Sequence, residues 1–289
     1  PQEPGHRVSD VELDALIRRL GQARRPVILA GTGVRAAHAN EEFATLIHRL
    51  GIPVTTAWTH DLIATDDPLF CGRPGTIGTR AGNFTVQNAD LLLVLGSRLN
   101  IRQVSYNWPG FAARAFKIQV DIDAAELEKP LVRPDLAICC DLRDFLVALN
   151  AQLAERPLPR NPEHEHWLAW CRQRFFAYPA VLPKHREFRG RINPYHFVEA
   201  LFDCLDEDDI VACGNASATI LPFQAGAIKH GMRMFSNSGS ASMGYDLPAA
   251  IGAYFGAVAS RGRQGRVVCL AGDGSIMMNL QELQTIAQH

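Results

Sequence analysis

A carboxylate flanked by glycines is the residue of this sequence best suited to chemistry. Asp273 lies in the run AGDGSIMMN, directly after an apolar stretch typical of a buried strand and directly before a helical pattern. Its side chain offers one hard oxygen ligand, and the backbone N–H groups beside it are free to donate. This combination suits a magnesium ion that bridges to a diphosphate. The alternative is an Asx turn, in which Asp273 binds only the neighbouring backbone.

A second glycine-bearing turn, GTGVRA at 31–36, also follows an apolar strand pattern. It matches G-x-G-x-x-A, the loop through which a backbone approaches a pyrophosphate at a helix N-terminus. The dinucleotide fingerprint also requires an acidic residue near the end of the next strand. Residues 55–57 read Thr-Thr-Ala at that place. An NAD dehydrogenase is therefore disfavoured, and glycines that simply allow a tight turn explain the loop at least as well.

The overall composition excludes several functional classes. The chain has 289 residues, 47% of them hydrophobic, which is enough for two domains with buried cores. A net charge of −1 gives no basic surface for nucleic acid. The sequence also lacks the run of about 18 apolar residues that a membrane-spanning helix requires. The opening residues show no secretory signal, so we expect a cytoplasmic protein without nucleic-acid or membrane partners. The seven cysteines form no CxxC pair and are predicted to be mostly buried free thiols: Cys71, Cys139, Cys140, Cys171, Cys204, Cys213 and Cys269.

The elements that must position these residues alternate between strand and helix patterns. Ser9 with Glu12 predicts a capping box that opens the first helix. The apolar side of that helix comprises Val11, Leu13, Leu16, Ile17 and Leu20. Five apolar runs predict strands, namely RPVILAGTG, IPVTTAW, DLLLVLG, FKIQVDID and LAICCD. Residues 1–153 are therefore predicted to form an α/β domain with a mainly parallel sheet.

The rest of the chain is predicted to hold a linker and a second domain. Residues 154–190 are rich in proline and charge and show little periodicity beyond a short Trp-containing helix, so we interpret them as a linker packed on the surface. The second domain, 191–289, starts with Asn193 as a helix cap and Pro194 at the first helical position. Helices then alternate with the strand patterns DDIVACG, RMFSN and RVVCLAG.

The last helix of the second domain is predicted from Asn279 as its cap and Glu282 three residues later. Its apolar side, expected to be buried, comprises Leu280, Leu283 and Ile286. Such a helix should lead into a further strand, so the second sheet looks truncated. The predicted fold class is α/β, with two doubly wound, mainly parallel-sheet (Rossmann-like) domains, the second truncated.

Two longer motifs in the second domain resemble a known family. NSGSASMGYDLPAAIGA and GDGSIMMNLQELQTIAQH are similar to the cofactor-binding domain of thiamine diphosphate-dependent enzymes, in particular the catalytic (large) subunit of acetolactate synthase. NADLLLVLGSRLN and VDIDAAELEKP resemble the central nucleotide-fold domain of that family, which places it at 1–153. The resemblance implies thiamine diphosphate and magnesium as cofactors, and decarboxylation and carboligation of 2-oxo acids as the reaction of a transferase or lyase.

Other functions stay open beside this one. A decarboxylase or a C–C hydrolase of the same family would use the same cofactor. A non-catalytic nucleotide-binding or regulatory module, built on the first domain, is the alternative from another class. The family forms its site between subunits, so the resemblance also implies a homodimer or homotetramer.

The resemblance assigns roles to individual residues of the second domain. Asp273 corresponds to the first metal ligand, and Gly274 with Ser275 donates backbone N–H groups to the diphosphate. Met243 corresponds to the bulky residue that bends the cofactor, so that its aminopyrimidine reaches the C2 proton. Ala241 replaces a glycine usual in the family, a change that the cofactor site is expected to tolerate. For Asn215 and Ser217 a diphosphate contact and a plain turn remain equally open. The predicted cofactor-binding residues are Asn215, Ser217, Ala241, Ser242, Met243, Gly272, Asp273, Gly274 and Ser275.

The resemblance also bears on both ends of the chain and on a second cofactor. The family carries an N-terminal domain with an activating glutamate, and a second metal ligand that would follow residue 289. We therefore expect a fragment that lacks a catalytic residue of its own and is inactive alone. FAD is allowed in the first domain but not favoured, because Asn100 replaces an acid. The residues near the positions that hold FAD in members of the family are Gly31, Gly33, Arg98, Asn100, Arg102 and Asp121.

Overall fold

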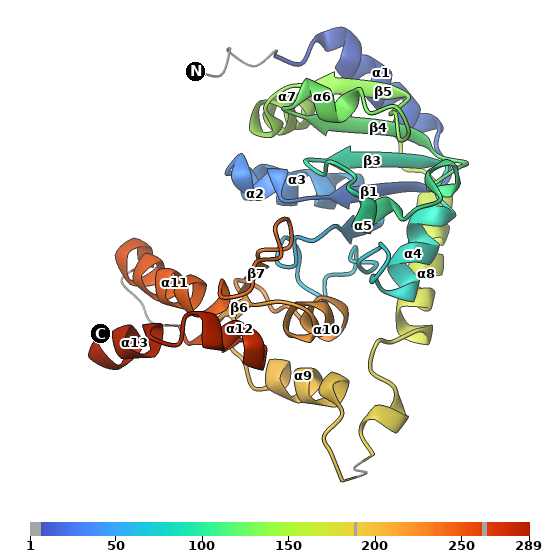
Figure 1. Cartoon of the computed structure of the whole chain (residues 1–289). Coiled ribbons are helices and arrows are strands. Elements are labelled where there is room, and N and C mark those ends of the chain that lie inside the picture. The colour runs from blue at the N-terminus through green and yellow to red at the C-terminus, as the bar shows by residue number, and fades with distance from the viewer. Residues whose placement is uncertain (1–6, 188–189, 262–264) are drawn as a thin grey trace. The chain divides into compact units, whose positions relative to one another are not determined.

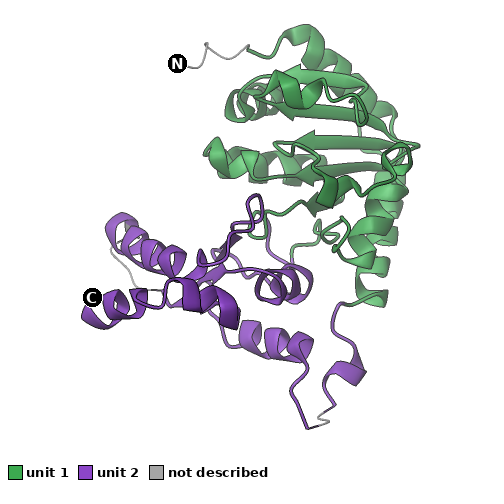
Figure 2. Ribbon diagram, in the orientation of Figure 1, with its two compact units in different colours: residues 1–62, 67–179 green, residues 63–66, 180–289 purple. Residues whose placement is uncertain are grey.

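The structure is a computed structural model that describes residues 7–187, 190–261 and 265–289 (Figure 1). The chain divides into two compact units (Figure 2). Unit 1 comprises residues 1–62 and 67–179, and unit 2 comprises residues 63–66 and 180–289. Within the described ranges, none of the helices has the length and apolar character needed to cross a membrane.

Unit 1 is built on a five-stranded parallel sheet with the order β2-β1-β3-β4-β5. The central pair, β1 and β3, is in register from Pro26 opposite Leu91 to Ala30 opposite Leu95, and all ten of these residues are buried. Such uninterrupted apolar strands are typical of a parallel sheet covered on both faces. The prediction of an α/β fold with parallel sheets is confirmed. The strands are β1 Pro26–Ala30, β2 Val54–Thr56, β3 Leu91–Leu95, β4 Phe116–Asp121 and β5 Leu136–Cys139.

Helices connect these strands. The predicted capping box at the start of α1 is confirmed, because the Glu12 backbone N–H donates to Ser9 Oγ and the Ser9 N–H donates to the Glu12 carboxylate. Val11 does not belong to the buried side of α1, since it is 78% exposed. The helices of unit 1 are α1 Asp10–Gln22, α2 Gly33–Ala36, α3 Asn40–Leu50, α4 Arg80–Gln87, α5 Ile101–Val104, α6 Ala124–Leu127, α7 Leu142–Glu155 and α8 Pro162–Ala177, with a 3-10 turn at Trp108–Gly110.

The helix α8 lies inside the segment 154–190 that we interpreted as a linker. It has 16 residues, more than the short helix expected there. Trp167 is buried, donates its indole N–H to the Pro26 carbonyl at 3.0 Å and stacks on Trp170. With Cys171 it joins the core that packs against β1 and β3. The aromatic spacing of α8 therefore reflects core packing, which its high charge content hid at the level of sequence.

Unit 2 has a three-stranded parallel sheet with the order β7-β6-β8. The Asn193 side chain caps the first helix by accepting the Tyr195 N–H, and Pro194 occupies the first helical position, as predicted. Phe202, Val211 and Met234 are among the buried residues of its core. The elements are η2 Pro183–His185, α9 Pro194–Asp203, β6 Ile210–Cys213, α10 Ser217–Ala225, β7 Arg233–Ser236, α11 Asp246–Arg261, β8 Val267–Leu270, α12 Asp273–Met278 and α13 Glu282–Gln288.

The predicted cap of the last helix is wrong. Asn279 ends α12, and its side-chain amide donates to the Gly244 carbonyl at 2.6 Å instead of accepting from α13. The helix α13 starts at Glu282 without a side-chain cap. Its apolar residues are not buried in the described chain, because Leu280, Leu283 and Ile286 are 43%, 43% and 48% exposed. The Asn279 side chain, which the local pattern assigned to the start of α13, thus bonds to the distant Gly244 instead.

The cysteines are free thiols throughout, as predicted. Cys71, Cys140, Cys171 and Cys213 are buried, and Cys139 and Cys269 are partly buried. Cys204 is the exception, since it is exposed at the end of α9.

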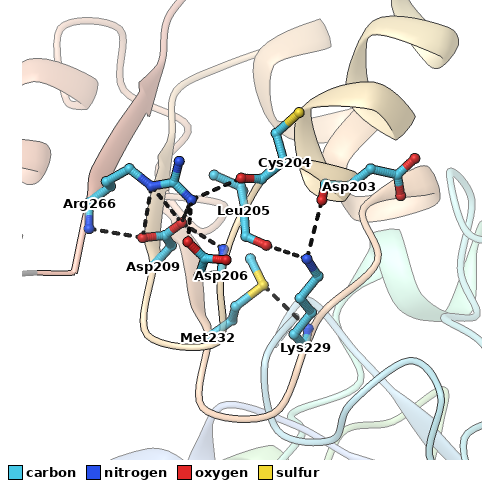
Figure 3. Close-up of polar contacts among 8 residues, drawn as sticks. All are labelled: Asp203, Cys204, Leu205, Asp206, Asp209, Lys229, Met232 and Arg266. Carbon is cyan, nitrogen blue, oxygen red and sulfur yellow. Dashed lines mark hydrogen bonds and ion pairs between the residues drawn. The ribbon is translucent and has the colours of Figure 1, made fainter.

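A cluster of charged groups joins the amino ends of β6 and β8 (Figure 3). Asp209, almost fully buried, accepts the backbone N–H groups of Asp206 at 2.8 Å and Arg266 at 2.9 Å. The Arg266 guanidinium donates to Asp209 Oδ2 at 2.6 Å, to Asp206 Oδ2 at 2.8 Å and to the Cys204 carbonyl at 2.8 Å. Lys229 donates to the carbonyls of Asp203 and Leu205 nearby. The Asp209 carboxylate is the centre of this cluster.

We expect unit 2 to lose stability as the pH falls through the acidic range. Burial acts to raise the pKa of Asp209, but the hydrogen bonds from Arg266 and from the backbone outweigh it and hold the pKa below its ordinary value. A lowered pKa in the folded state means that the ionised group stabilises the fold above about pH 4 and that this contribution disappears as the pH falls further. Amide exchange of β6, corrected for its intrinsic pH dependence, should show this loss of stability. Asp209→Asn should make the stability of unit 2 less dependent on pH. An equal pH dependence in the two proteins would contradict the assignment.

Candidate cofactor site

The predicted cofactor-binding residues follow the carboxyl ends of the three strands of unit 2. Residues 214–217 come after β6, residues 237–243 after β7 and residues 272–275 after β8. Because neighbouring parallel strands end at the same edge of a sheet, these three turns lie together. The structure thus gathers at one edge residues that are up to 60 positions apart.

Asp273 is the first residue of α12, and its carboxylate is exposed. The first backbone bond of the helix runs from the Ile276 N–H to the Gly272 carbonyl, so the N–H groups of Asp273, Gly274 and Ser275 keep no helical acceptor. Among the described residues none forms a hydrogen bond or ion pair with the Asp273 side chain, so the alternative Asx turn is not formed. No group of three or more potential metal ligands occurs in the ranges that the structure covers. Within the described part of the chain, Asp273 is therefore a single free carboxylate beside free amide donors.

Met243 lies directly over the glycine turn that contains Asp273. A Cβ atom placed on Gly274 would be only 3.1 Å from Met243 Cε. Gly274 therefore leaves room for the methionine side chain, which remains 48% exposed. The two motifs singled out in the sequence meet at this contact.

The turn before Met243 contains a strained residue. Ala241 has a φ of +52°, in the left-handed region that favours glycine. This conformation costs a residue with a Cβ about 1 to 2 kcal/mol. The Ala241 N–H donates to the Asn237 carbonyl at 2.7 Å, and Ser242 beside it is exposed. The backbone thus accommodates Ala241 where the family usually has glycine, at a cost in strain.

Asn215 and Ser217 differ in their surroundings. The Asn215 side-chain nitrogen is buried and has no hydrogen-bond partner among the described residues. Ser217 is exposed at the start of α10. A buried donor without an acceptor costs stability, so Asn215 is suited to a ligand that brings an acceptor oxygen. The contact with a diphosphate stays a prediction for both residues.

Behind the turns lies a polar network that the sequence did not reveal. Ser275, predicted only as a backbone donor, is buried, and its hydroxyl accepts the Gly244 N–H at 2.8 Å and donates to Asp246 Oδ2 at 2.5 Å. Asp246 is fully buried at the first residue of α11. The available signal was its place directly before an apolar helical pattern, where an aspartate is typical of a helix start.

In unit 1, the glycines of the turn at 31–36 serve close packing. The Gly31 N–H donates to the Leu95 carbonyl and the Gly33 N–H donates to the Gly96 carbonyl, at 2.8 and 2.9 Å. A Cβ on either glycine would lie within 2.5 Å of a Gly96 atom. These two N–H groups are therefore engaged within the protein, as the tight-turn interpretation requires.

Three other residues named for FAD also have partners within unit 1. Asn100 caps α5 by accepting the N–H groups of Arg102 and Gln103, and Arg98 approaches Glu126 at 3.5 Å. Asp121 accepts the Asp123 N–H at 3.1 Å. A role in binding FAD stays a prediction for this set.

Comparisons with known proteins agree with this division of the chain. Residues 13–149 match the family described as "Thiamine pyrophosphate enzyme, central domain", and residues 214–289 match "Thiamine pyrophosphate enzyme, C-terminal TPP binding domain". The second match covers all three turns of the candidate site.

Several similar proteins are acetolactate synthases. A probable acetolactate synthase 2, chloroplastic, from Oryza sativa subsp. japonica is 35% identical over 278 residues, which cover 95% of this chain and 40% of that protein. The acetolactate synthase isozyme 1 large subunit of Escherichia coli is 33% identical over 93% of this chain and 45% of its own length. A probable acetolactate synthase large subunit from Methanocaldococcus jannaschii is 31% identical over the whole chain and 47% of its own length.

The chain spans 40 to 47% of the length of these relatives. Both family matches, the two parallel sheets and the meeting of Met243 with the Asp273 turn lead to the same assignment. The chain belongs to the thiamine pyrophosphate enzymes, with their central domain in its first half and their cofactor-binding domain in its second.

Proposed function

We propose that this chain holds magnesium and the diphosphate of thiamine diphosphate in an enzyme that decarboxylates a 2-oxo acid and joins the remaining unit to a second carbonyl, as expected of an acetolactate synthase-like transferase or lyase. The observation that carries the proposal is the meeting of two motifs at the edge of the β7-β6-β8 sheet. There Met243 Cε would be 3.1 Å from a Cβ on Gly274, next to the free carboxylate of Asp273.

The residues present fit this cofactor. Asp273 offers magnesium a hard oxygen ligand that no described residue occupies, and the N–H groups at the start of α12 suit the negative charge of a diphosphate. The unpartnered buried Asn215 nitrogen supplies a further donor at the same edge. Met243, 48% exposed, presents an apolar surface beside the Gly274 turn.

The chemistry itself belongs to the cofactor. Thiamine diphosphate, when bound, supplies the carbon nucleophile that attacks the 2-oxo group and the electron sink that allows carbon dioxide to leave. The residues of this chain bind and orient it: Asp273 through the metal, the glycine turn through its N–H groups and Met243 through its side chain. We assign no proton transfer to a side chain of these 289 residues.

A series of thermal unfolding experiments tests this proposal. Thiamine diphosphate with Mg²⁺ should raise the unfolding temperature, because a ligand at 100 times its Kd stabilises the folded state by about 2.7 kcal/mol. The same experiment with EDTA added should remove the shift. Stabilisation by adenine nucleotides alone would instead favour a nucleotide-binding or regulatory module and would overturn the proposal.

Met243→Ala is expected to separate binding from activation of the cofactor. The diphosphate anchors remain, so affinity should change little, whereas the loss of the apolar support should slow C2 proton exchange of bound thiamine diphosphate by roughly tenfold or more. NMR of the quenched exchange reaction measures this rate. Met277→Ala is the matched control, since Met277 is an exposed methionine of α12. Equal C2 exchange in the two variants would show that Met243 has only an ordinary packing role.

We further propose that the protein works as a homodimer or homotetramer in the cytoplasm, with neither nucleic acid nor a membrane as partner. The net charge of −1 supports the absence of a polyanion partner. Light scattering of the purified protein tests the assembly, and a monomer under all cofactor conditions would contradict it.

A further inference from the structure

We infer that Asp246 is a positioning residue of the cofactor site, which holds the turn carrying Met243 against the helix that begins at Asp273. This inference rests on the proposed function, because it gives that site its shape. It adds a residue to which neither the sequence motifs nor the family comparison gave a role.

The first link is a chain of hydrogen bonds. Asp246 is completely buried, and its Oδ2 accepts the Ser275 hydroxyl at 2.5 Å while its Oδ1 accepts the Leu247 N–H at 3.0 Å. A serine hydroxyl has a single proton, so donating it to Asp246 turns the lone pairs toward other donors. The Gly244 N–H uses this acceptor at 2.8 Å. The carboxylate thereby orients the hydroxyl that holds Gly244.

The second link is the fixation of Gly244 from both sides. Its N–H is held by Ser275, and its carbonyl accepts the Asn279 side-chain amide at 2.6 Å. Gly244 has a φ of +82°, and a Cβ there would lie 2.8 Å from Asn279 and 3.1 Å from Met278. The backbone therefore lies directly against α12. Met243 is the preceding residue, so a shift of this backbone moves the side chain that contacts the Asp273 turn.

The third link connects the remaining strand. A Cβ on Gly214 would lie 2.4 Å from Asp246 Oδ2 and 3.1 Å from the Leu270 carbonyl. The carboxylate therefore packs directly on the turn after β6, next to Asn215. A single buried side chain thus contacts the turns that follow β6 and β8 directly, and it reaches Gly244, just beyond the turn that follows β7, through the Ser275 hydroxyl. Burying a carboxylate is costly, and an apolar side chain would fill the space without that cost. Holding these turns in register is the role that the carboxylate adds.

The first test needs no cofactor. Asp246→Ala and Ser275→Ala in the full chain should each speed exchange of the Gly244 amide hydrogen by roughly tenfold, because the N–H loses its oriented acceptor. The double variant should exchange no faster than the faster single variant, since both substitutions break one chain of bonds. Ile228→Val, a buried substitution elsewhere in unit 2, controls for a general loss of stability. Ser275→Ala keeps the inference testable should Asp246→Ala fail to fold.

The second test uses bound thiamine diphosphate with Mg²⁺. Ser275→Ala and Asp246→Ala should both slow C2 proton exchange by roughly the tenfold expected for Met243→Ala. In Asp246→Ala, affinity for Mg²⁺ and inorganic pyrophosphate should stay within about twofold of wild type. Unchanged Gly244 exchange, or a parallel loss of pyrophosphate affinity and C2 exchange, would overturn the positioning role alone. Failure of the wild-type chain to bind thiamine diphosphate would overturn the proposed function and the inference with it.

Discussion

Asp273→Asn is expected to weaken magnesium-dependent binding of thiamine diphosphate by at least the roughly 10- to 100-fold that loss of a supporting outer-shell partner costs at a metal site. The reason is the ligand chemistry, because a neutral amide does not replace a carboxylate on a hard cation. The stability of the folded state should change little, since the Asp273 carboxylate is exposed and binds none of the described side chains. The free energy of unfolding should stay within about 0.5 kcal/mol of wild type.

Titration calorimetry with and without Mg²⁺ measures the affinity, and chemical unfolding measures the stability. Asp203→Asn is the matched control, because Asp203 is an exposed aspartate of α9 in the same unit. Equal affinity in the Asp273 and Asp203 variants would exclude Asp273 as a ligand of magnesium. A large loss of stability in Asp273→Asn would instead show that its carboxylate supports the fold.

Trp167→Ala is expected to lower the free energy of unfolding of unit 1 by about 3 to 5 kcal/mol, the usual cost of removing a large buried aromatic side chain. The indole is 5% exposed, bonds to the Pro26 carbonyl and stacks on Trp170. Its removal leaves a cavity where α8 meets β1.

Tryptophan fluorescence during urea unfolding can follow this loss, because all four tryptophans of the chain belong to unit 1. Phe176→Ala is the matched control on the same helix, since Phe176 is 67% exposed. Its effect should stay near 0.5 kcal/mol. Similar effects of the two substitutions would show that α8 is a surface helix after all, as the linker interpretation of 154–190 implied.

The strands were predictable because parallel sheets covered on both faces require uninterrupted apolar runs. Leu91–Leu95 and Pro26–Ala30 are fully buried and apolar, so their sequence pattern indicates a buried strand without ambiguity. Helix starts were predictable where one side chain decides them, as at Ser9 and Asn193. Such caps depend on bonds between residues two or three positions apart, which the sequence displays directly.

The errors arose where a side chain had both a local and a distant partner. Asn279 was predicted to cap α13, but it bonds to Gly244, which lies 35 positions earlier. Trp167 was assigned to a surface linker because its neighbours are charged. Its hydrogen-bond partner, Pro26, is 141 positions away and could not be recognised from the local sequence. Periodicity describes one element at a time and cannot weigh such partners.

The sequence by itself determined the alternation of strands with helices and the family, and it singled out Asp273 as a candidate metal ligand, because each depends on residues that are close along the chain. The tertiary structure decided which of these residues act together. Only the alignment of three parallel strands brings Met243 over Gly274 and leaves Asp273 without a partner among the described residues. Only folding buries Asp246 against Gly214 and Ser275 and links it through the Ser275 hydroxyl to Gly244, because no local pattern connects these residues.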